Sequence, residues 1–160
     1  MDKNILRQAE IESFDGVEKV HFLNDNAKRI NKSLGDLTGL TGIGVHLVEI
    51  EPGHDSTELH AHYYEDECVY ILEGEATATI GDTTSIVRAG DFIAYPAGGA
   101  AHKLQNSGPG PLRCLVIGQR LKHDVADYPA KGKRIFRNSG LAWNLVDLDQ
   151  IDEPSAGRKI

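Results

Sequence analysis

The central part of the chain alternates short apolar runs with turn-forming residues. The first run, 43–50, is rich in β-branched residues and stops at Pro52-Gly53. Seven more runs follow at spacings near ten residues, each closed by glycine, proline or polar residues: 56–63, 68–72, 76–80, 85–87, 92–95, 102–104 and 112–118. Runs of this length and spacing are typical of β-strands, so the pattern predicts an all-β jelly roll or small barrel. Gly81-Asp82 is expected at the turn of a hairpin.

The two ends of the chain are polar and weakly patterned. Residues 24–34 predict one short helix, and residues 35–42 predict a loop. Near the other end, residues 141–151 alternate weakly, which predicts an edge strand or a segment that packs Trp143 on the barrel or on a partner. No internal repeat is present, so we expect a single barrel. The expected parts are an irregular N-terminal extension (1–42), the barrel (43–118) and an irregular C-terminal extension (119–160).

Composition narrows the class of protein. The 160 residues are 40% hydrophobic and 26% charged, which is ordinary for one soluble globular domain. Seventeen basic and twenty-four acidic side chains give a net charge of −7, which argues against binding to nucleic acid or to anionic membranes. The N-terminus lacks the apolar core of a signal peptide, and no apolar run approaches ~20 residues, so we expect a cytoplasmic protein. Cys68 and Cys114 form no CxxC pair and are expected to be reduced thiols.

Three histidines and a glutamate are the candidate chemistry. Residues two apart on a strand point to the same face, so His60 and His62 are expected to enter the same space. Glu67 shares a face with Val69 and Ile71 on the next run and can join them from a neighbouring strand. His102 follows a turn of proline and glycine. Three imidazoles and one carboxylate suit a single divalent metal ion, such as zinc, iron, manganese or nickel.

These residues resemble the paired motifs of the cupins, G-x5-H-x-H-x3or4-E-x6-G and G-x5-P-x-G-x2-H-x3-N. The first motif is matched by Gly53, His60, His62, Glu67 and Gly74, and the second by Gly90, Pro96, Gly98, His102 and Asn106. Each motif has one extra residue in a loop, before His60 and before His102. The resemblance implies a β-barrel over about residues 43–118, a mononuclear metal and frequent dimers. It implies no particular reaction, because one fold hosts many.

Other charged residues are expected outside the first coordination sphere. Glu65 shares the parity of Glu67, but only Glu67 fits the six-residue gap to Gly74, and Glu65 belongs to an acidic turn that is free to face solvent. His46 and His54 are expected at the surface or in loops.

Three functions remain open. The first is a metal-dependent isomerase of a sugar phosphate, in which the metal polarises a carbonyl; Lys103 and the basic stretch 131–137 are the candidates for holding the phosphate. The second is an iron-dependent dioxygenase. The third is a module that binds a small polar molecule without chemistry. Whatever the function, we expect a homodimer, with the N-terminal segment or the tail around Trp143 crossing to the partner, because a small barrel leaves sheet edges that need cover. No sequence feature assigns a catalytic base. No helix-turn-helix pattern is present, which excludes a fused DNA-binding regulator.

Overall fold

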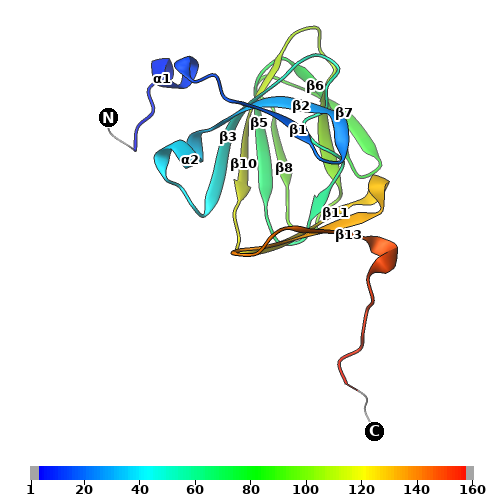
Figure 1. Ribbon diagram of the computed structural model, residues 1–160. Coiled ribbons are helices and arrows are strands. Elements are labelled where there is room, and N and C mark those ends of the chain that lie inside the picture. Colours follow the sequence, from blue (N-terminus) through cyan, green and yellow to red (C-terminus); the bar gives the residue numbers. More distant parts are fainter. Residues whose placement is uncertain (1–3, 158–160) are drawn as a thin grey trace.

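The computed structural model describes residues 4–157 and consists mainly of antiparallel β-strands (Figure 1). The strands are β1 (Val17–His21), β2 (Asn24–Ser33), β3 (Ile43–Ile50), β4 (Ala61–His62), β5 (Glu67–Glu73), β6 (Glu75–Ile80), β7 (Thr83–Arg88), β8 (Phe92–Tyr95), β9 (His102–Asn106), β10 (Leu112–Gln119), β11 (His123–Tyr128), β12 (Lys133–Asn138) and β13 (Asn144–Asp147). The helices are α1 (Gln8–Ser13), α2 (Leu34–Thr38), η1 (Pro129–Lys131) and η2 (Leu148–Gln150). Within residues 4–157, no helix has the length and apolar character needed to cross a membrane.

Two sheets enclose the main core. The larger sheet has the strand order β1-β2-β3-β10-β5-β8, and the smaller has the order β7-β6-β9. Buried side chains from both sheets form one apolar cluster, in which Ile50, Ile71 and Leu112 are fully buried. Because each strand buries alternate residues, the two sheets must face each other across this cluster. The predicted jelly-roll barrel is therefore confirmed, as is the hairpin of β6 and β7.

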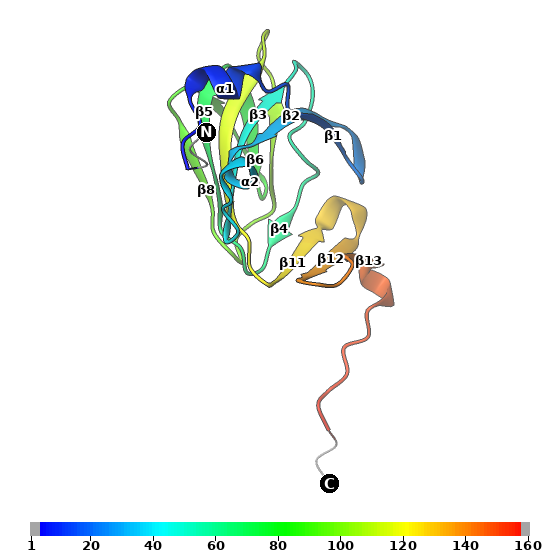
Figure 2. The ribbon, with the colours of Figure 1, turned by 60° about the vertical axis from the view of Figure 1, so that its left-hand side comes forward.

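A third sheet closes one end of the barrel. Its order is β13-β12-β11-β4, and Figure 2 shows it at the lower end of the barrel, with the C-terminal segment leading away from it. The predicted strand over 56–63 is reduced to the two residues of β4, which pair with β11 at His62↔Ala126 and Ala61↔Asp127. This pairing brings residues about 60 positions apart in the sequence beside the histidines.

Both ends are more regular than the sequence indicated. The helix predicted over 24–34 is wrong, because these residues form β2 between β1 and β3. The predicted loop over 35–42 instead begins with α2. In β2 only Ala27 and Asn31 are buried, and a spacing of four residues fits one face of either a helix or a strand. Hydrogen bonding to β3 decides between the two. At the other end, β13 is the edge strand that residues 141–151 allowed.

Candidate metal centre

The four predicted ligands come together from three strands and the loop before β4. His60 lies in that loop, His62 in β4, Glu67 at the start of β5 and His102 at the start of β9. His60 and His102 exchange backbone hydrogen bonds of 3.2 and 2.8 Å, and their ring centroids lie 4.6 Å apart. The ring centroids of His60 and His62 lie 4.8 Å apart, so both imidazoles enter the same space as expected.

The spacing of the donor atoms suits one ion. Coordinating atoms of His60, His62 and Glu67 all lie within 4.8 Å of one another, and His102 Nε2 lies 3.8 Å from Glu67 Oε1. Ligands held about 2.1 Å from one ion are separated by roughly 3 to 4 Å, so small side-chain adjustments would close the set. That these four residues bind a metal remains a prediction.

Each histidine of the group uses Nδ1 in a hydrogen bond to an oxygen. An oxygen acceptor of this kind cannot donate, so Nδ1 carries the proton and Nε2 keeps a free lone pair for a metal. His102 Nε2 is buried and has no hydrogen-bond partner within residues 4–157, which is the state that a ligand atom would need. The three contacts are His60 Nδ1 to Glu58 O at 2.9 Å, His62 Nδ1 to Asp124 Oδ2 at 2.7 Å and His102 Nδ1 to Ala100 O at 3.3 Å.

The protonation states also fit a metal ion. Burial lowers the pKa of His60 to about 3, so this imidazole is neutral at pH 7. Burial alone would raise the pKa of Glu67, but the facing histidines, His102 first among them, outweigh burial and leave this pKa below its usual value. Metal ligands must be unprotonated, and His60 and Glu67 meet this requirement at pH 7. The donor set therefore fits a borderline divalent cation.

Asp124, on β11, fixes the orientation of His62. Its side chain is only 1% exposed, and Oδ1 accepts hydrogen bonds from the backbone N–H groups of Tyr64 at 3.2 Å and Glu65 at 3.3 Å. Oδ2 accepts from His62 and from Arg137 on β12. Burial would raise the pKa of Asp124, but the hydrogen bonds from His62 and Arg137 outweigh it and hold this pKa well below its usual value. The carboxylate is thus a permanent anion behind His62.

Glu65 is not free in solvent as the sequence suggested. It is 7% exposed, its Oε1 accepts a hydrogen bond from Leu121 N at 2.8 Å, and its Oε2 accepts one from Arg137 Nη2. His62, Glu65 and Asp124 are close enough to form a second ligand group. The Arg137 guanidinium, however, donates to both carboxylates and already supplies the positive charge between them. The expectation failed because β12, which carries Arg137, is remote in sequence.

The cations predicted to hold a phosphate are already paired with carboxylates. Lys103 Nζ lies 3.3 Å from Asp55 Oδ1. The four cations of the stretch 131–137 form five ion pairs: Lys131 with Glu58, Lys133 with Asp147, Arg134 with Asp127, and Arg137 with both Glu65 and Asp124. These pairs connect the third sheet internally and to the loops before and after β4. The basic stretch therefore has a clear structural role.

The candidate ligands open onto a large cavity of about 1190 Å³. His46 was expected at the surface or in a loop, but it lies on β3 and lines this cavity. His21 and Arg29 also line it, and no motif in the sequence pointed to either. Tyr95 stacks on His102 with ring centroids 3.6 Å apart, and its buried hydroxyl has no hydrogen-bond partner within the described residues. The cavity thus offers polar and charged groups beside the candidate metal site.

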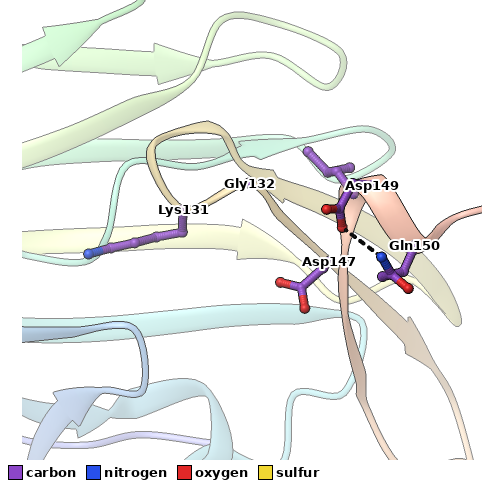
Figure 3. A pocket seen from close by; sticks show the side chains of 6 residues that line it. Lys131, Gly132, Asp147, Asp149 and Gln150 are labelled. Atoms are coloured by element: carbon purple, nitrogen blue, oxygen red, sulfur yellow. Dashed lines mark hydrogen bonds between the residues drawn. The ribbon is translucent and has the colours of Figure 1, made fainter.

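A smaller depression of about 480 Å³ lies on the third sheet (Figure 3). It is lined by Lys131, Gly132, Asp147, Leu148, Asp149 and Gln150. Figure 3 shows Lys131 pointing away from the two aspartates, while Gln150 and Asp149 contact each other. The residues that line it include no histidine or cysteine, so it lacks the donors of the large cavity.

Comparison with known proteins matches residues 46–118 to the cupin domain family. Similarity to one solved structure extends over nearly the whole chain. A "putative sugar phosphate isomerase" from Acidithiobacillus ferrooxidans is 49% identical, with a TM-score of 0.92 over 96% of this chain and 98% of the other. A "sugar phosphate isomerase from a cupin superfamily" from Silicibacter pomeroyi is 28% identical, with a TM-score of 0.79 over 90% and 94%.

A shorter match is found to an uncharacterized protein of Methanocaldococcus jannaschii. It is 39% identical over 66 residues, which are 41% of this chain. The matched part spans about half of that curated relative, 52% of its length. This match therefore supports a shared barrel and carries no information about activity.

Proposed function

This chain belongs to the cupin superfamily, and we propose that it is a metal-dependent isomerase that acts on a phosphorylated sugar. The observation that carries the proposal is the set of three histidines and one glutamate that lie together and open onto one large cavity. The near full-length similarity to a "putative sugar phosphate isomerase" supports the choice of substrate class.

In this proposal His60, His62, Glu67 and His102 hold one divalent ion. The ion, when bound, would polarise the carbonyl group of an open-chain sugar. Isomerisation also requires a group that moves a proton between adjacent carbons. His21 and His46 line the same cavity, and burial lowers the pKa of each, that of His21 to about 4. Both are therefore neutral at pH 7 and are the proposed proton carriers.

The test begins with the metal. We would purify the full chain without added metal, identify the bound ion by elemental analysis, and reload chelated protein with zinc, manganese, iron or nickel. Interconversion of aldose and ketose phosphates is then followed by NMR. We expect at least one metal to support it and the His60→Ala/His62→Ala double variant to lose both metal and activity.

Two results would contradict the proposal. Oxygen consumption by the iron-loaded protein without any isomerisation would favour a dioxygenase. Binding of a sugar phosphate without turnover, for every metal tried, would favour a binding protein. His21→Asn and His46→Asn variants, each with its metal content measured, then decide which histidine moves the proton: the carrier should lose turnover while keeping its metal.

A further inference from the structure

Arg29 is a cation on β2 that lines the same cavity as the candidate metal ligands. It lines the large cavity together with His60, Glu67 and His102. Its side chain is half-buried. Burial lowers the pKa of Arg29, and the negative charge of Glu67 opposes this effect. The guanidinium therefore shares one cavity with the candidate ligands.

Arg29 differs from the other arginines that line this cavity. Arg120 is paired with Asp36, and Arg137 with Glu65 and Asp124. None of the ion pairs formed within residues 4–157 includes Arg29. Burial lowers the pKa of Arg29, but from so high a value that the group stays protonated at pH 7. A half-buried positive charge without an anionic partner is unfavourable until an anion reaches it.

The orientation of the guanidinium is fixed at one end. Arg29 Nη1 donates to the backbone oxygen of Ser56, in the loop after β3. That loop is itself held on β2, because Asn26 Nδ2 donates to Gly53 O at 3.0 Å and Asn24 Nδ2 to Asp55 Oδ2 at 3.1 Å. Nε and Nη2 of Arg29 make no hydrogen bond within the described part of the chain. The free side of the fork can therefore donate two parallel hydrogen bonds to one ligand.

We propose that Arg29 binds the anionic group of the substrate, which is the phosphate in the function proposed above. The inference rests on that function for the choice of phosphate, but the anion site itself rests on the unpaired guanidinium. Phosphate oxygens match the geometry of the guanidinium fork, and the partly buried setting strengthens a charge-assisted hydrogen bond. Arg29 would thus select phosphorylated over neutral sugars.

Calorimetric titration with inorganic phosphate tests the site directly. The metal-loaded full chain should bind phosphate, and Arg29→Gln should raise the Kd at least about tenfold, the scale of losing hydrogen bonds to a charged group. Lys28→Gln is the matched control: it removes the same charge from the neighbouring, exposed residue of β2, which points to the other face, and should leave the Kd within about twofold. Arg29→Lys keeps the charge but loses the fork and should be intermediate.

Repeating the titration on protein stripped of metal by a chelator separates the contribution of Arg29 to phosphate binding from that of the metal. The difference in Kd between wild type and Arg29→Gln must persist without the ion. Sulfate and acetate are the comparison anions. If acetate binds as tightly as phosphate, the group that Arg29 binds is a carboxylate and the assignment to phosphate is wrong. Equal phosphate affinity in wild type, Arg29→Lys and Arg29→Gln, with the variants shown to be folded by their melting curves, would overturn the site.

The failure of this inference can be told apart from failure of the proposed function. If the protein isomerises sugar phosphates but Arg29→Gln has an unchanged KM, the function stands and the assignment of Arg29 is wrong. If no sugar phosphate is isomerised but phosphate binding still depends on Arg29, the anion site stands and the function is wrong.

Discussion

Replacing Asp124 by Asn tests whether the hydrogen bond from His62 Nδ1 to Asp124 Oδ2 is needed for metal binding at the candidate centre. Oδ1 of Asp124 accepts two backbone N–H groups, so the amide oxygen of an asparagine should take that position. Its NH2 group must then face His62 Nδ1, where Oδ2 accepts a hydrogen bond at 2.7 Å. A donor at this position forces Nδ1 to become the acceptor and moves the imidazole proton to Nε2. The lone pair that a metal would use is lost.

The expected loss of metal affinity is 10- to 100-fold, the usual cost of removing an outer partner of a metal-bound histidine. This corresponds to about 1.4–2.7 kcal/mol of binding free energy. Competition with a chromophoric chelator measures the affinity, and ¹⁵N chemical shifts of the imidazole report which nitrogen of His62 is protonated. The two readouts should change together.

Asp127→Asn is the matched control for this experiment. Asp127 lies on the same strand, β11, and is likewise paired with an arginine of β12, Arg134. Its hydrogen-bonded partners within residues 4–157 are Tyr63 and Arg134, neither of which is a histidine. We expect its metal affinity to stay within about threefold of wild type, because only a partly exposed ion pair is lost. Equal affinities in the Asp124 and Asp127 variants, or an unchanged His62 tautomer, would refute the reasoning.

Three further predictions concern stability and assembly. Gly74→Ala should lower the free energy of unfolding by about 2 kcal/mol or more, because φ is +90° and the new Cβ would lie 2.6 Å from Pro111 O. Gly90→Ala is the control: φ is +96° but the space is open, so the loss should be only about 1 kcal/mol. Urea titrations measure both. Burial lowers the pKa of His21 to about 4 from 6.5, so the unfolded state binds more protons between these values. The unfolding free energy of the metal-free protein should therefore fall from pH 6.5 to 4, and His21→Gln should flatten the slope. The exposed edge strand β1 should pair with a second copy of the chain in a homodimer. Light scattering measures the mass in solution, and the mass of a single chain would contradict this prediction.

The sequence by itself determined the barrel and its four candidate ligands, because both depend on local spacing. Short apolar runs between turn residues required a sheet protein. The two-residue separation of His60 and His62 placed both rings on one side whatever strand they joined. The six-residue gap to Gly74 distinguished Glu67 from Glu65. Polar residues 24–34 lacked such a signal, since two buried positions four apart suit a helix as well as β2.

Only the tertiary structure decided which charges meet. Asp124 lies 62 residues from His62 and reaches it because β11 pairs with β4. The same packing joins Arg137 to two carboxylates and so removes it from the candidates for binding a phosphate. Arg29, in a segment without any recognisable motif, lines the cavity of the candidate ligands and forms no ion pair with another residue of 4–157. The function of a charged side chain depends on which groups lie next to it. Those neighbours are set by the pairing of strands that are distant in the sequence, so local spacing along the chain cannot predict them.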